Sequence, residues 1–151
     1  MYLPMSIYSK LPIYNSVFFL LKDLYERVPK FAKQYKYLLG EKMLGCCIES
    51  VMLLGRISDI KNNEKRIAYV TEINDNMSKL LVYVRIANEL HQLGGENVYF
   101  FLSDKILDIL NQTENWKKFL QKKEHSRNSP SADGEVGKKE CHLPLLEFAH
   151  R

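Results

Sequence analysis

Apolar residues recur at alternating steps of three and four between Ile67 and Leu93, and the rest of the chain is arranged around this stretch. The spacing predicts one long amphipathic helix with a single buried stripe, because residues three or four apart share a helical face. The stripe consists of Val70, Ile73, Met77, Leu80, Val84, Ala87 and His91. We expect His91 to pack at the end of the stripe or to cap the helix C-terminus.

Three further stretches have the same periodicity. The first opens at Leu11-Pro12, where proline suits the first helical turn, and should end or kink near Val28 because Pro29 follows. The other two cover about residues 37–60 and 96–120. The predicted stripe positions are Tyr14, Val17, Leu21, Leu24, Val28 and Phe31; then Leu39, Met43, Cys46, Ser50, Leu53, Ile57 and Ile60; then Val98, Leu102, Ile106, Ile109, Thr113, Trp116 and Leu120.

Glycines occur inside the second predicted helix, at Gly40, Gly45 and Gly55. A helical glycine costs up to about 1 kcal/mol relative to alanine. We therefore expect a neighbouring helix to approach closely at these positions.

The breaks between the helices are short. Asn62 and Asn63 separate the second helix from the third, with Asn63 as the expected N-cap. Gly94 and Gly95 end the third helix, and Glu96 suits the first turn of the fourth. Four helices with short connections predict an all-α fold, an antiparallel up-down four-helix bundle.

The domain organisation follows from composition. Residues 1–10 form an N-terminal extension, residues 11–122 the bundle, and residues 123–151 a tail that we expect to be disordered, since residues 125–139 are rich in Ser, Gly and charge. A short apolar patch at 142–148 lies within the tail. It is either fortuitous or a segment that docks on a partner.

The chain has 151 residues, of which 46% are hydrophobic, enough for a single domain with a core. Its apolar runs, such as 17–21 and 51–54, fall far short of the roughly 20 residues that span a bilayer. Residues 1–10 lack a basic region followed by an apolar block and a cleavage site. We expect a cytoplasmic protein that does not enter a membrane.

The reactive side chains match no catalytic or metal pattern. Cys46 and Cys47 are adjacent on one predicted helix and, with Cys141, make an odd count, which favours reduced and buried thiols. A di-iron bundle requires two Glu-x-x-His pairs, whereas the sequence has only one, Glu147 with His150, and the cysteines lack zinc-ligand spacing. Phosphate-binding glycine loops and nucleophile motifs are missing from the sequence. We expect no cofactor, no metal and no enzymatic activity.

Charge gives a weaker signal. The net charge is +4, and residues 1–62 carry nine Lys and Arg against five Asp and Glu, while the remainder is balanced at thirteen of each. This excess is compatible with an acidic partner, although solubilising charge explains it as well. The candidate nucleic-acid contacts on the second and third helices are Lys42, Arg56, Lys61, Lys65, Arg66, Lys79 and Arg85.

A second candidate patch lies between the first two helices. Lys30, Lys33 and Lys36 alternate there with aromatic residues, among them Tyr35. Lysines interleaved with aromatic rings can hold a phosphate backbone and stack bases. The alternative is a solvated turn between helices.

Four segments together resemble one family. They are Leu11-Pro12-Ile13-Tyr14, Tyr37-Leu38-Leu39-Gly40-Glu41-Lys42, Lys79-Leu80-Leu81-Val82-Tyr83-Val84-Arg85-Ile86-Ala87 and the stop from Leu90 to Gly94. In order and spacing, over about residues 11–120, they are similar to the accessory variability determinant (Avd) proteins of diversity-generating retroelements.

The resemblance implies a four-helix protomer that forms a homopentameric barrel and binds nucleic acid through a basic surface. It also implies a reverse transcriptase as partner, with which Avd proteins support mutagenic cDNA synthesis from a template-repeat RNA and retrohoming into a variable gene. The accessory protein has no catalytic residues in that scheme. Lys42, Lys79 and Arg85 coincide with basic places in the family pattern.

The chain departs from this pattern in places. Leu81 and Asn88 stand where relatives often have basic residues, and Pro29 replaces a proline more usual near Ala32. The basic surface is therefore expected to be weaker or displaced toward the first helix. The alternatives are a purely protein-binding oligomeric scaffold, or an RNA-binding protein like those encoded in 23S rRNA intervening sequences, whose second-helix motif is replaced here by the residues at 47–55.

Overall fold

The computed structural model describes residues 11–127, and this part of the chain folds into four long helices with no strand. The helices are α2 (Pro12–Arg27), α4 (Glu41–Ile57), α5 (Asn63–Glu89) and α6 (Glu96–Arg127). The all-α prediction is confirmed, and all four helices lie where the apolar periodicity placed them.

The connection between α2 and α4 is itself helical. It consists of a 3₁₀ turn η1 (Val28–Lys30), a short helix α3 (Lys33–Tyr35) and a π-helical turn η2 (Lys36–Gly40). Helix α2 ends at Arg27, one residue before the predicted end, because Pro29 cannot donate the next backbone hydrogen bond.

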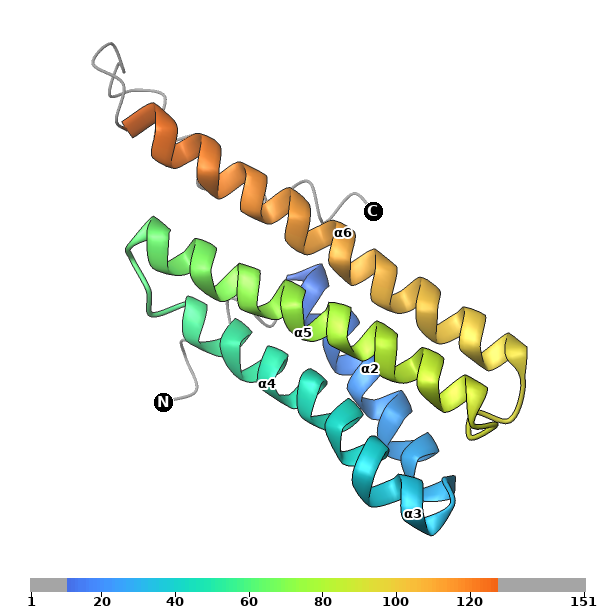
Figure 1. Ribbon diagram of the computed structural model, residues 1–151. Helices are drawn as coiled ribbons and strands as arrows, with labels where there is room; N and C mark the ends of the chain where they lie inside the picture. Colours follow the sequence, from blue (N-terminus) through green and yellow to red (C-terminus); the bar gives the residue numbers. More distant parts are fainter. Residues whose placement is uncertain (1–10, 128–151) are drawn as a thin grey trace.

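Each long helix packs against two others. Helix α5 lies between α4 and α6, and α2 contacts both α4 and α6 from the other side (Figure 1). The α5 stripe faces inward, and burying a Leu or Ile side chain of this kind contributes about 1.5–3 kcal/mol. The fully buried members of the stripe are Val70, Ile73, Met77, Leu80, Val84 and Ala87.

The predicted position of His91 on this stripe is wrong. Helix α5 ends at Glu89, and His91 is exposed with a φ of 58°. Its backbone N–H donates to the Asn88 carbonyl at 3.0 Å, and the Gln92 N–H donates to the Ala87 carbonyl at 2.9 Å. This pair of bonds is the Schellman arrangement, so the backbone of His91 ends the helix one turn before Gly94.

Two other helix boundaries differ from the prediction. The N-cap of α5 is Asn62 and not Asn63, because the Asn62 side chain accepts the backbone N–H groups of Glu64 and Lys65 at 2.8 and 3.2 Å. Helix α6 continues beyond Lys122 to Arg127, so residues 123–127 are helical. The predicted extension at 1–10 and the tail from residue 128 lie outside the described residues.

Polar side chains join α6 to α5 and α2. The Asn74 amide of α5 donates to the Thr113 hydroxyl at 2.7 Å, and the Gln112 amide donates to Ser16 of α2 at 3.4 Å. A buried polar group that misses its partner costs about 1–3 kcal/mol, so a shift of α6 along its neighbours is unfavourable. This register places the C-terminal part of α6 beside the connection from α4 to α5.

The glycines of the second helix have different environments. A Cβ atom at Gly40 would overlap Cγ1 of Val28, so the close approach predicted there is confirmed, although the neighbour is the 3₁₀ turn. At Gly45 the expectation is wrong, because the position is exposed and a Cβ atom would meet nothing within 4 Å. Gly55 is half-buried.

This contrast predicts opposite effects for one substitution. Gly45→Ala should stabilise the protein by about 0.5–1 kcal/mol, because alanine restricts the unfolded chain and fits the helix. Gly40→Ala should destabilise it, because Val28 must move. Urea unfolding followed by circular dichroism measures both, and a stable Gly40→Ala variant would contradict the packing described for η1.

Candidate functional site

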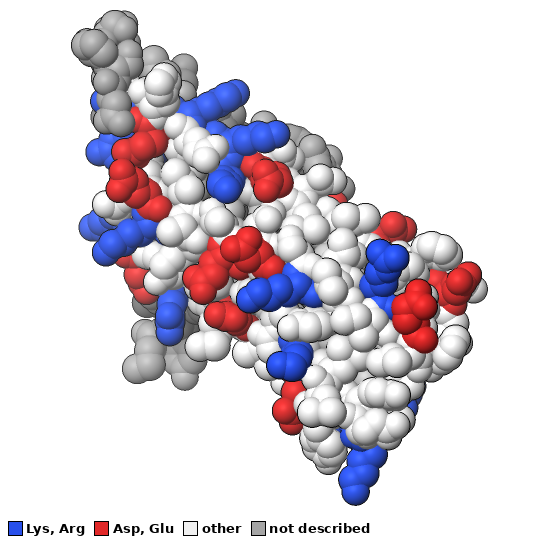
Figure 2. Space-filling view, viewed as in Figure 1, with Lys and Arg blue, Asp and Glu red and all other residues white. Residues whose placement is uncertain are grey.

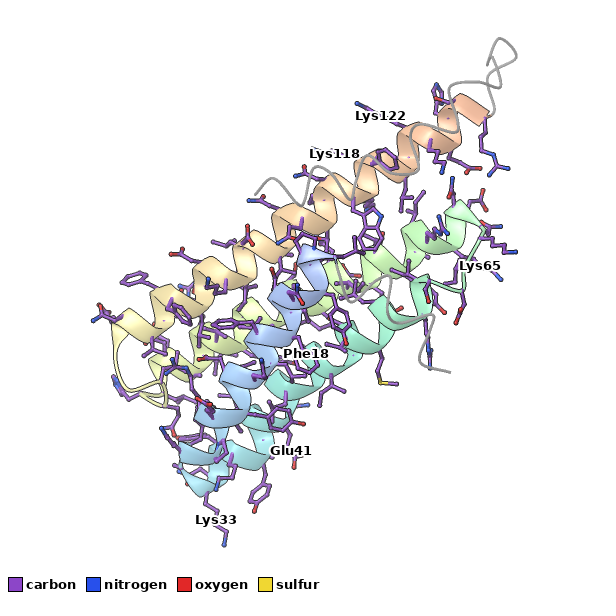
Figure 3. All side chains as sticks on the ribbon, turned by 180° about the vertical axis from the view of Figure 1, so that it is seen from behind. Phe18, Lys33, Glu41, Lys65, Lys118 and Lys122 are labelled. Carbon is purple, nitrogen blue, oxygen red and sulfur yellow. The ribbon has the colours of Figure 1, made fainter. Side chains whose placement is uncertain are left out.

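The side chains of the predicted cations are at least partly exposed, but the structure does not gather them in one patch. Lys65 lies at one end of the bundle and Lys33 at the other (Figure 3). Along α5 alone, Lys65 and Arg85 are separated by twenty residues, or about 30 Å. A surface that contains all of the predicted residues is therefore long and discontinuous.

Four of them gather where α4 passes into α5. Arg56 lies in the last turn of α4, Lys61 in the connection, and Lys65 in the first turn of α5. Arg66 is half-buried, and its Nε donates to the Ile60 carbonyl at 2.6 Å. Arg66 thus stabilises the α4–α5 connection through this hydrogen bond, whereas Arg56, Lys61 and Lys65 are exposed to solvent.

The C-terminal part of α6 adds cations that the sequence-based prediction missed. Residues 115–127 contain five Lys and Arg and one acidic residue, Glu124. Lys118 and Lys122 are exposed and one helical turn apart, so they share a face. Neither forms an ion pair within 4 Å among residues 11–127. The sequence feature that could have identified this region is the presence of four lysines within residues 117–123.

One cation from each group borders a common hollow. Lys61 from the connection and Arg127 from the end of α6 line an open pocket of about 610 Å³, together with the acidic residues Glu64 and Glu124. Figure 3 shows Lys65, Lys118 and Lys122 at this end of the bundle, with the α6 lysines on a different side from Lys65. We call this region the basic end; it comprises Arg56, Lys61, Lys65, Arg66, Lys117, Lys118, Lys122 and Arg127.

The opposite end carries the second predicted patch. Lys30 and Lys33 are exposed, while Tyr35 and Lys36 are half-buried, in the helical turns before α4. Lys42 follows in the first turn of α4 and is exposed. These residues cluster locally, but the length of the bundle separates them from the basic end.

Lys79 and Arg85 lie between the two ends on α5, about 9 Å apart along the axis and about 120° apart around it. Both are exposed. Lys79 and Glu49 act in opposite directions on the pKa of the Cys46 thiol of α4, which Lys79 lowers and Glu49 raises. Figure 2 shows Lys and Arg interspersed with Asp and Glu over α4 and α5, which weakens this face as a site for a polyanion.

The thiols of α4 are buried, as predicted. Burial raises the pKa of Cys47 to about 12, with a contribution from Cys46. Burial also raises the pKa of Cys46, against a lowering by Lys79 and a further raising by Glu49. Within residues 11–127, no three His, Cys, Asp or Glu side chains are grouped to hold a metal ion.

We expect Cys46 and Cys47 to resist a thiol reagent at neutral pH in the folded protein, because the reactive species is the thiolate. Reactivity should rise only as the pH approaches the raised pKa values. Counting modified cysteines by mass spectrometry, before and after denaturation in urea, tests this. Rapid modification of Cys47 in the folded state would contradict its burial.

Comparisons of the chain with protein-family models, curated proteins and solved structures find no match. A search of the described helices for a membrane span also finds none that is long and apolar enough. What the basic end can bind must therefore be inferred from its own side chains. Exposed lysines on two sides of this end can contact separate phosphates of one polyanion.

Proposed function

We propose that this protein is a non-enzymatic accessory protein that binds RNA or cDNA through the basic end. The observation that supports this proposal best is the concentration of exposed cations from α6 and the α4–α5 connection. Residues 115–127 and 56–66 together contain nine Lys and Arg, six of them exposed, and three acidic residues, an excess of six, against +4 for the whole chain. Such contacts are made to phosphates and carry little sequence preference.

The wider role is proposed from the resemblance to Avd proteins. In this proposal the chain is an antiparallel up-down bundle that assembles into a homopentamer in the cytoplasm. It binds the reverse transcriptase of a diversity-generating retroelement together with the template-repeat RNA and its cDNA. Its contribution is to hold the nucleic acid during mutagenic cDNA synthesis and retrohoming, while the polymerase supplies the chemistry.

A protein-binding scaffold is the second candidate, and the outer surface of η2 and α4 supports it. Leu38, Ile48 and Met52 are exposed at 70%, 37% and 54%. Together with the open position at Gly45, these side chains form an apolar stripe that another protein or subunit can cover. If the protein retains the polymerase in a pull-down but has no affinity for nucleic acid, the scaffold is correct.

A salt titration with single-stranded RNA tests the proposed binding. The logarithm of the association constant should fall linearly with the logarithm of the salt concentration, by about 0.7 for each phosphate contact. Fluorescence anisotropy with RNAs of unrelated sequence provides the data, and the slopes should agree between sequences. Affinity that does not change with salt would contradict binding through the basic end.

A further inference from the structure

Three phenylalanine rings lie at the surface of α2 and α6, far from the basic end in sequence. Phe18 and Phe19 of α2 are 38% and 49% exposed, and Phe101 of α6 is 37% exposed. The rings of Phe19 and Phe101 meet edge to face across the two helices, with their centroids 6.4 Å apart. Helix α2 lies at the front in Figure 3, where Phe18 is labelled.

Two lysines lie over these rings. The Lys105 Nζ atom is 5.5 Å from the Phe19 centroid and 5.6 Å from that of Phe101. The Lys22 Nζ atom is 5.6 Å from the Phe18 centroid. Neither lysine has an ion pair within 4 Å among residues 11–127. We call the three rings and the two lysines the aromatic face.

The C-terminal part of the chain has a complementary composition. Residues 143–148 read Leu-Pro-Leu-Leu-Glu-Phe, with four large apolar side chains and one carboxylate, Glu147. A fully buried aromatic side chain removes 150–250 Å² from water, so covering the partly exposed rings is favourable. We propose that residues 143–148 dock on the aromatic face of the same chain, with Glu147 beside Lys22 or Lys105.

The chain between them is long enough. Lys105 lies 22 residues before Arg127 on α6, which corresponds to about 33 Å along the helix. Residues 128–142 can extend over about 50 Å, at roughly 3.3 Å per residue. The segment therefore reaches the aromatic face without any change in α6.

Charge distinguishes this segment from the other apolar terminus. Residues 1–10 also contain large apolar side chains, but their charged side chain is Lys10, which the two lysines of the aromatic face repel. Asp108 lies one turn after Lys105, but its carboxylate accepts a hydrogen bond from the Gln112 amide at 2.9 Å and forms no ion pair with Lys105. Both Lys22 and Lys105 are therefore available to Glu147.

A spin label on Cys141 of the full chain tests the docking. Cys46 and Cys47 are buried with raised pKa values, so the reagent discriminates against them, and peptide mapping verifies the labelled position. We expect broadening of the backbone amide resonances of residues 18–22 and 101–105. The broadening should be lost with Leu145→Asp/Leu146→Asp, while the rest of the spectrum stays unchanged.

Matched variants of the surface complete the test. Phe19→Ala/Phe101→Ala should abolish the broadening, whereas Tyr25→Ala/Phe100→Ala, which removes two other exposed rings from the same helices, should leave it intact. Absence of broadening in the unmodified chain would overturn the proposal. It would also be overturned if broadening survived the tail substitution. Docking between copies, which would overturn it too, is detected if an observed chain without the spin label shows the same broadening when it is mixed with spin-labelled copies.

Discussion

Replacing Lys118 and Lys122 by glutamine is expected to weaken RNA binding and flatten its salt dependence. Both side chains are exposed on one face of α6 and belong to the basic end. If each contacts one phosphate of a single strand, the slope of the salt titration should fall by about 1.4 in total. Fluorescence anisotropy at several salt concentrations, with circular dichroism to verify the fold, measures this effect.

The matched control is Lys79→Gln/Arg85→Gln, which removes the same charge from the middle of α5. Acidic side chains are interspersed with the cations on this face in Figure 2. We therefore expect the control to weaken binding less than the α6 variant. The opposite order would favour the middle of α5, where two of the three cations that match the Avd pattern lie.

Truncating the centre of the α5 stripe should have the largest effect on stability. Ile73 is fully buried, and Ile73→Ala should lower the free energy of unfolding by about 2–5 kcal/mol through lost burial and the cavity left behind. Urea unfolding monitored by circular dichroism measures the change.

Val82→Ala is the control on the same helix. Val82 is 57% exposed, so the substitution should change stability by no more than about 0.5 kcal/mol. Equal effects at Ile73 and Val82 would contradict the direction in which α5 faces.

The periodicity of the sequence was sufficient to predict the four helices and most of their buried stripes. Burial repeats with the helical period, so the apolar pattern of α5 also indicates which face of the helix is buried. Ser50 was predicted on the α4 stripe and is fully buried, with its hydroxyl donating to the Cys46 carbonyl at 2.8 Å. Composition was less informative, because helix α6 extends past the predicted boundary at Lys122.

Helix ends depend on backbone geometry that residue type only suggests. His91 adopts the left-handed conformation usually taken by glycine, so the end of α5 precedes the glycines that the sequence offered as a stop. Asn62 and Asn63 are chemically identical, and only the extended conformation of Asn62 decides which one caps α5. Residue type alone therefore does not decide where α5 begins or ends.

The basic end could not be predicted from sequence distance. Lys61 and Arg127 lie 66 residues apart, and they line one pocket because α6 packs along α5. Counting charge by halves of the chain assigned the excess to residues 1–62, whereas the strongest local concentration includes the end of α6. The prediction of candidate cations on α4 and α5 therefore covered only part of this region.

Crosslinking to RNA most directly tests whether the basic end is the nucleic-acid site. A single-stranded RNA carrying 4-thiouridine is irradiated in complex with the full chain, and the crosslinked peptides are identified by mass spectrometry. We predict crosslinks in residues 115–127 and 56–66, and their loss at high salt. Crosslinks confined to residues 30–42, or to the middle of α5, would contradict the account.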